Sequence, residues 1–188
     1  MYLQSDRWNV SIRLATALFV ATVVLSAATP VALGQSGPAK TAPGHREPPG
    51  YKEAVGNALG EFEQANFVEA REHFLRAHRL FPNARTLRGL GMSEFELRNY
   101  IDAASYLREA LTSEEKRLDG RLRDKAIALV ARASAYLGTV RLRLRPATAT
   151  VRVDGFATEL PASGELTLQI GDHVLQVQAP LLTPQQTT

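Results

Sequence analysis

Between Tyr51 and Gly138 the apolar residues recur at steps of three and four positions, which is the spacing of one face of an α-helix. Pro82 is the one proline in this stretch, and it falls where the pattern breaks. The spacing predicts five helices, which cover residues 51–64, 67–81, 84–97, 100–112 and 120–138.

The first four of these helices form two similar units. Apolar and small side chains of the first unit reappear 33 residues later in the second, as Ala70 and Ala103 do. A repeat of this length is typical of stacked helix pairs, in which each pair covers the apolar face of its neighbour. Asn66 and Asn99 precede the second helix of each unit, where an asparagine side chain can cap backbone N–H groups. Small residues that let the helices approach closely are expected at Ala58, Ala70, Gly89, Gly91 and Ala103.

After Gly138 the apolar spacing changes from about 3.6 to 2, which is the period of a half-buried β-strand. Apolar residues alternate with arginines over 140–145, and three similar runs follow, separated by turn signals such as Asp154-Gly155. We predict a small antiparallel β-sandwich over 139–180 and a polar tail over 181–188. With a helical domain over 51–138, the expected fold class is α+β.

The N-terminal 34 residues have the order of a secretory signal. A polar, basic start precedes an uncharged apolar run over 14–28, and small residues follow. We predict cleavage after Gly34, with the position after Ala28 as the alternative. An uncleaved inner-membrane anchor over 14–33 is the other interpretation, and both predict export to the periplasm or cell envelope. Residues 35–50 are rich in proline and glycine and predict a linker.

Composition narrows the classes of function. The chain has 188 residues, 22 basic and 19 acidic, with a formal net charge of +3 and no cysteine. The lack of cysteine excludes disulfides, thiolate zinc sites and a cysteine nucleophile. Basic and acidic residues interleave along the chain, which is not the pattern of a nucleic-acid-binding surface. We therefore expect no nucleic-acid partner.

Motifs that carry catalytic chemistry are missing from the sequence. Neither a nucleophile elbow, a zinc-protease motif, a phosphate-binding loop nor a calcium loop occurs. His73 and His78 are five positions apart, so they do not share a helix face as metal ligands four positions apart do. We expect no catalytic residue, no metal site and no cofactor, and we predict that the protein is not an enzyme.

The helical unit resembles the tetratricopeptide repeat (TPR) family. The order of small, aromatic and small residues followed by proline is carried by Ala70, Phe74, Ala77 and Pro82 in the first unit. The second unit carries the order with Leu90-Gly91, Tyr100, Ala103, Leu107 and Ala110, and it has Glu115 where proline would stand. This resemblance implies a protein-interaction module in which the first helix of each pair lines a concave groove.

The β-rich segment resembles the PEGA domain in its layout of Val151–Gly155, Gly171–His173 and Ala179-Pro180. That family continues with a further strand where this chain has Leu181-Leu182, so an incomplete module is one interpretation. Together the two parts resemble exported TPR–PEGA proteins of myxobacterial type. The resemblance implies a scaffold or interaction protein associated with the bacterial cell surface.

By the resemblance to TPR proteins, six side chains face the groove, namely Lys52, Val55, Leu59, Arg85, Arg88 and Met92. The apolar members suit varied partners and the cations suit a carboxylate, so we predict that a segment of an exported or membrane protein binds there. The alternatives are that these residues only keep the groove soluble, or that the β module acts as an envelope spacer or contacts the cell wall or its glycans. Self-association is a further way to complete a stack of two repeats.

Overall fold

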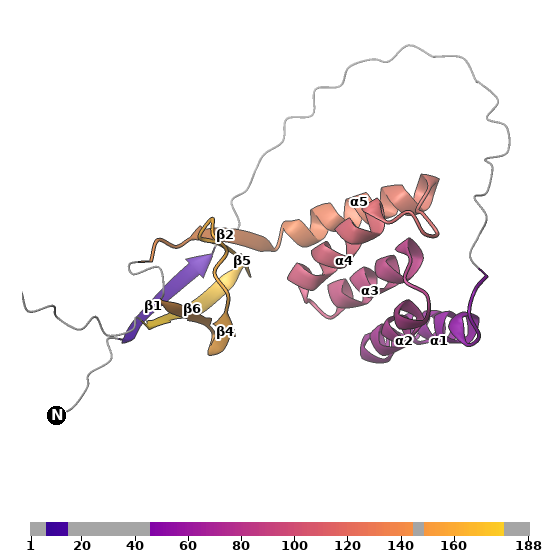
Figure 1. Cartoon of the computed structure of the whole chain (residues 1–188), viewed down its shortest axis with the longest axis horizontal. Helices are drawn as coiled ribbons and strands as arrows, with labels where there is room; N and C mark the ends of the chain where they lie inside the picture. The colour runs from indigo at the N-terminus through magenta and orange to yellow at the C-terminus, as the bar shows by residue number, and fades with distance from the viewer. Residues whose placement is uncertain (1–6, 15–45, 145–148, 179–188) are drawn as a thin grey trace, which may run out of the picture.

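The computed structural model describes residues 7–14, 46–144 and 149–178. In this part of the chain, five stacked helices lie beside antiparallel β-sheets, so the fold class is α+β, as predicted (Figure 1). The helices are α1 (Tyr51–Glu63), α2 (Phe67–Leu80), α3 (Ala84–Glu96), α4 (Tyr100–Thr112) and α5 (Gly120–Ser134). The strands are β1 (Arg7–Leu14), β2 (Leu137–Arg141), β3 (Thr150–Val153), β4 (Phe156–Thr158), β5 (Glu165–Gln169) and β6 (Gly171–Gln178).

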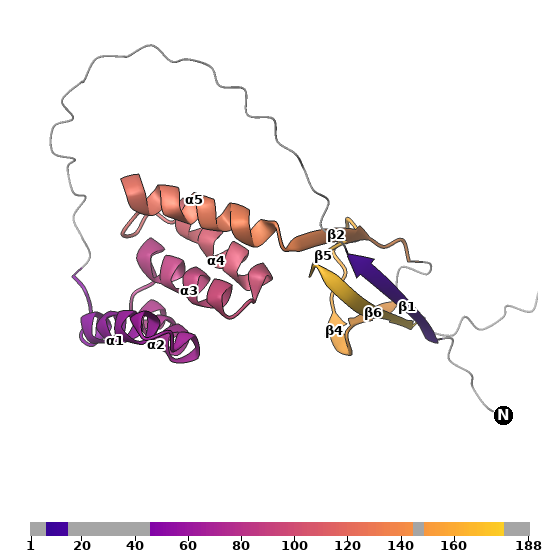
Figure 2. The ribbon, with the colours of Figure 1, turned by 180° about the vertical axis from the view of Figure 1, so that it is seen from behind.

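The four helices of the two predicted hairpins are confirmed to within one residue at each end. Each helix packs against the next in the chain, from α1 to α5, and the view from behind shows the α1–α2 hairpin and α5 at opposite ends of the stack (Figure 2). Helix α5 ends at Ser134, earlier than predicted, because the chain already enters strand β2 at Leu137.

Residues 33 positions apart occupy equivalent buried places in the two hairpins. The side chains of α2 and α4 that face inward are buried in both hairpins, and the same holds for α1 and α3. The two units therefore bury the same face, which is the packing that the periodicity predicts. The buried pairs are Ala54 and Leu87, Ala58 and Gly91, Ala70 and Ala103, Phe74 and Leu107, and Ala77 and Ala110.

Helix α3 lies so close to its neighbours that two of its positions require glycine. A Cβ atom built on Gly89 would lie 2.4 Å from Cε1 of Phe74 in α2. A Cβ atom on Gly91 would lie 2.5 Å from Cγ of Leu107 in α4. Both neighbours are buried and have no room to withdraw. The two glycines thus serve close helix packing, as predicted.

The prediction that Asn66 and Asn99 cap their helices is wrong. Neither side chain accepts a hydrogen bond from the backbone of the following helix. Instead the amide of Asn66 donates to Glu61 (2.8 Å) and that of Asn99 donates to Glu94 (2.7 Å), five residues upstream. The tight turn places each amide beside the carboxylate of the preceding helix, so the asparagines join the two helices of a hairpin.

The strands form two antiparallel sheets, one with the order β1-β6-β3-β4 and one that pairs β2 with β5. Residues of both sheets contribute to a single apolar core, so the two sheets pack against each other as two layers. Strands β1 and β4 are additional to the four that the sequence predicts. Residues 7–14 do alternate between polar and apolar side chains, but in the sequence they belong to the predicted basic start of a signal, and β4 has three residues, too few to show a period. The buried core residues are Val151, Val153, Leu166, Leu168 and Leu175.

The helical stack and the β-rich part meet at the end of α5. The ring of Tyr136 stacks on that of Tyr100 from α4, with the ring centroids 4.1 Å apart. The Tyr136 carbonyl accepts a hydrogen bond from the Ile170 N–H (2.8 Å), which lies between β5 and β6. The chain therefore passes from helix to strand at a junction that is held from both sides.

Strand β1 comes from the segment whose sequence predicts a signal. It pairs with β6 along its whole length, from Arg7 opposite Gln178 to Leu14 opposite Gly171. Ile12 packs against the core of the β-rich part. The rest of the apolar run, the predicted cleavage sites after Ala28 and Gly34, and the predicted tail over 181–188 lie outside the described residues. None of the helices in the described ranges combines the length and apolar character needed to cross a bilayer.

Replacing Gly89 or Gly91 with alanine should destabilise the helical stack by about 1–3 kcal/mol, because overpacking outweighs the better helix propensity of alanine, about 1 kcal/mol. Gly60→Ala is the matched control, since no atom lies within 4 Å of a Cβ built there. That variant should be neutral or more stable. Urea unfolding followed by far-UV circular dichroism measures the three changes, and stabilisation by Gly89→Ala or Gly91→Ala would contradict the described packing.

Deleting residues 1–34, as the predicted cleavage would, should expose one edge of β6. The Val174 carbonyl accepts from Asp154 N–H on the β3 side of the sheet, so Leu175 and Val177 direct their backbone groups toward β1. Amide hydrogen exchange at these two residues should accelerate in the shortened chain, whereas Gln176, which faces β3, stays protected. Unchanged exchange at Leu175 and Val177 would show that β1 does not protect β6 in solution.

Candidate binding groove

A hollow of about 430 Å³ lies between α1 and α3 and reaches the loop that precedes α5. The structure brings together in it all six residues that the sequence places in a groove. On each helix the cations lie toward the N-terminal end and the apolar side chains toward the C-terminal end. Residues three and four positions apart share a helix face, so the three residues of each helix point to one side. The six are Lys52, Val55 and Leu59 from α1, and Arg85, Arg88 and Met92 from α3.

The groove continues beyond this hollow toward α5. An adjoining depression of about 360 Å³ shares Phe62, Arg88 and Met92 with the first and extends to Leu129 and Arg132 of α5. Helices α1, α3 and α5 therefore line one channel, while α2 and α4 lie behind them. Such a channel is long enough to contact successive side chains of a bound segment.

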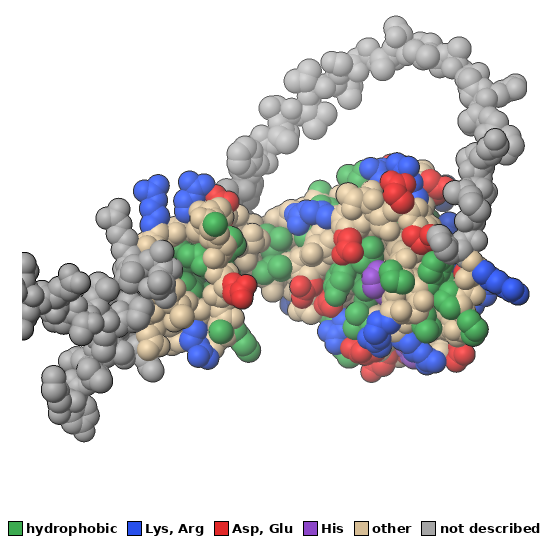
Figure 3. All heavy atoms as spheres, in the orientation of Figure 1, with side chains coloured by type: hydrophobic (Ala, Val, Ile, Leu, Met, Phe, Trp, Pro, Cys, Tyr) green, Lys and Arg blue, Asp and Glu red, His purple; other side chains and the backbone are tan. Residues whose placement is uncertain are grey.

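Cations outnumber carboxylates along this channel. Two carboxylates, Glu47 and Glu96, are among its lining residues. A hollow lined by one sign of charge with apolar walls attracts ligands of the opposite sign. The face in Figure 3 shows acidic and basic side chains intermixed over the helical part. The cations are Lys52, Arg85, Arg88, Lys116, Lys125 and Arg132.

Arg88 is the one cation that lines both hollows, and it has no ionic partner among the residues that the structure describes. Its side chain is half-buried, and Phe62 and Met92 line both hollows with it. Within the described ranges, no carboxylate lies at ion-pair distance from its guanidinium. Burial lowers the pKa of Arg88, yet a guanidinium stays charged at neutral pH. A partly desolvated, unpaired cation is costly, and a carboxylate ligand would compensate it.

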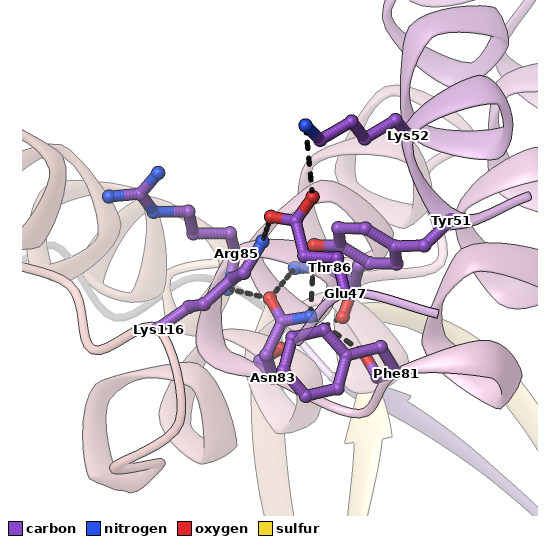
Figure 4. Close-up of polar contacts among 8 residues, drawn as sticks. All are labelled: Glu47, Tyr51, Lys52, Phe81, Asn83, Arg85, Thr86 and Lys116. Carbon is purple, nitrogen blue, oxygen red and sulfur yellow. Dashed lines mark hydrogen bonds and ion pairs between the residues drawn. The ribbon is translucent and has the colours of Figure 1, made fainter. Parts of the chain in front are cut away.

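Asn83 sets the position of α3 relative to α1. Its side-chain oxygen accepts from the backbone N–H groups of Arg85 (3.0 Å) and Thr86 (3.1 Å), and so caps α3. Its amide donates to the Tyr51 hydroxyl (3.0 Å) and the Phe81 carbonyl (2.6 Å). Figure 4 shows these contacts meeting at one buried side chain. Asn83 therefore fixes the end of the groove at which Arg85 lies.

Lys116 and Glu47 complete that end of the groove, and the sequence analysis missed both. The Lys116 ammonium lies 4.3 Å from the centroid of the Tyr51 ring and 5.3 Å from that of Phe81, and it bonds the Glu47 carboxylate. The Glu115 carbonyl accepts from Ala84 N–H (2.9 Å), which ties the loop to the start of α3. Neither residue lies on a helix, so helical periodicity contains no signal for them.

Comparison of the chain with protein-family models, curated proteins and solved structures gives no match. The chemistry of the groove is therefore argued from its own residues. Within the described part of the chain, no group of three or more metal-ligating side chains comes together. The groove combines apolar surface along α1 and α3 with cations, and this combination suits a ligand that carries both apolar groups and carboxylates.

Asn83→Ala should cost about 2–3 kcal/mol of stability, because it removes a helix cap, worth about 1 kcal/mol, and leaves buried polar groups without partners. Asn66→Ala is the control, since Asn66 also precedes a helix but is exposed and does not cap it. It should cost less than about 0.5 kcal/mol. Chemical denaturation of both variants measures the difference, and equal losses would contradict the capping role.

Proposed function

We propose that this chain is a non-enzymatic interaction and scaffold module of the bacterial cell envelope, which binds a segment of another exported or membrane protein in its groove. The two hairpins repeat at the 33-residue offset, which supports a TPR-like helical part. The residues that the TPR resemblance assigns to the groove line one continuous channel, which supports its use for binding.

The observation that carries the proposal is the half-buried Arg88, which lies among apolar side chains and has no ionic partner in the described part of the chain. Leu59 is 49% exposed in the same hollow, although leucine is a residue that folding normally buries. A partner with an acidic side chain between apolar ones would satisfy the cation and cover the apolar surface in one step. We therefore propose an extended or helical segment of that composition as the ligand.

The proposed location in the cell envelope is supported by the signal-like order of the N-terminal 34 residues and by the resemblance of the β-rich part to the PEGA domain. Export with cleavage after Gly34 would leave the helical and β-rich parts as the mature protein. Contact with the membrane itself would follow only if residues 14–33 stay attached as an anchor.

The test is selection of peptides from a random library on the immobilised full chain. Recovered peptides should combine Asp or Glu with apolar residues. Arg85→Glu/Arg88→Glu should weaken the binding of a recovered peptide at least tenfold, about 1.4 kcal/mol, because it replaces attraction by repulsion within the groove. Fluorescence anisotropy with the labelled peptide measures the affinities.

Arg76→Glu/Arg79→Glu is the matched control. It makes the same charge change at the same spacing, on exposed positions of α2 that do not line the groove. It should leave peptide affinity within about twofold. Peptides without acidic residues, or equal losses in the two double variants, would refute the cationic groove as the binding site.

A further inference from the structure

The cationic end of the groove already holds a carboxylate, and it belongs to the chain itself. One oxygen of Glu47 bonds the Lys116 ammonium, and the other lies 3.8 Å from the Lys52 ammonium (Figure 4). The two lysines come from α1 and from the loop before α5, while Glu47 precedes both in the residues before α1. Cations from separate elements thus converge on one acidic side chain.

The segment that carries Glu47 is attached to the helical stack mainly through this carboxylate. In the described part of residues 46–49, the backbone makes one hydrogen bond, from Tyr51 N–H to the Pro48 carbonyl (3.2 Å). Arg46 is exposed, and Pro48 and Pro49 restrict the backbone without giving it donors. A segment with so few contacts separates from the stack at low cost in free energy.

Lys116 and Lys52 form a seat for a carboxylate, and this seat does not satisfy Glu47 completely. Glu47 Oε2 is inaccessible to solvent and has no hydrogen-bond partner. The Arg85 guanidinium, which also lines the groove, points away from Glu47 and adds only to the positive field around it (Figure 4). Lys116 holds its place with a left-handed backbone (φ 46°), which lysine rarely adopts. Glu47 is therefore held by one ammonium bond and one longer ion pair, and a ligand carboxylate that also reaches Arg85 would gain a donor that Glu47 lacks.

We propose that Glu47 is an internal competitor, whose carboxylate occupies the seat that an acidic group of the partner segment takes when it binds. This inference rests on the proposed function of the groove. Binding then requires Glu47 to leave Lys116 and Lys52, and the partner's carboxylate replaces it. A seat that is filled about nine-tenths of the time lowers the apparent affinity about tenfold.

The experiment compares Glu47→Gln with Glu96→Gln in the full chain. Glu96 also lines the groove and makes no ion pair within the described residues, so both variants remove one negative charge from the channel. With the acidic peptide recovered by the selection above as the probe, Glu47→Gln should bind about tenfold more tightly. Glu96→Gln should gain less than about twofold, because its charge is screened and holds no seat.

Displacement of Glu47 has a direct readout, because the chain has no cysteine and Arg46→Cys gives a single site for a spin label. The acidic peptide should raise the mobility of the label, whereas the same peptide with glutamine for its acidic residues should not. Binding with an unchanged label and equal gains in the two glutamine variants would overturn the internal competitor and leave the proposed function intact. Absence of peptide binding to every variant would overturn both.

Discussion

The close approach of α3 to α2 on one side and α4 on the other is the constraint on which the helical part depends. Phe74 and Leu107 occupy the space that side chains at Gly89 and Gly91 would take. With those two faces covered, α3 has one remaining long face, and that face carries Arg85, Arg88 and Met92 into the groove. The geometry of the binding surface is thus a consequence of how tightly the helix behind it is packed.

Among the described residues, the cations of the groove are compensated at one end and not in the middle. The end near α1 is closed by contacts that cross the stack, in which Asn83 ties α3 to Tyr51 and Lys116 lies over the same ring. Glu47 compensates the cations at that end, and the bond with Lys116 keeps the pKa of Glu47 below its usual range. Arg88, in the middle, has no such compensation within the described residues. In the proposed binding mode a ligand meets a seat that Glu47 already occupies at one end and an uncompensated cation at the centre, so binding is coupled to the release of Glu47.

In the β-rich part, the important feature is which strands cover the two edges of β6. Strand β6 has β3 on one side over half of its length and β1 on the other side over all of it. Because β1 belongs to the segment with the order of a secretory signal, export with cleavage and a complete sheet are mutually exclusive in one chain. An uncovered edge of this length is a template for further strand pairing, so the fate of residues 7–14 decides what the β-rich part presents to its surroundings.

The sequence determined the helical part almost residue by residue, because a face such as that of Ala70, Phe74 and Ala77 repeats locally and needs only neighbouring turns of helix to specify it. The resemblance of the sequence to TPR proteins also predicted six groove residues, and all six line one hollow. Tertiary structure alone decided the contacts between elements distant along the chain, namely Asn83 with Tyr51, Lys116 with Glu47, and β1 with β6. No local pattern encodes such contacts. Residues in a loop or linker have no period, and even where a period exists, as in β1, it does not say which strand lies opposite, because the partner is chosen only when the helices and strands come together.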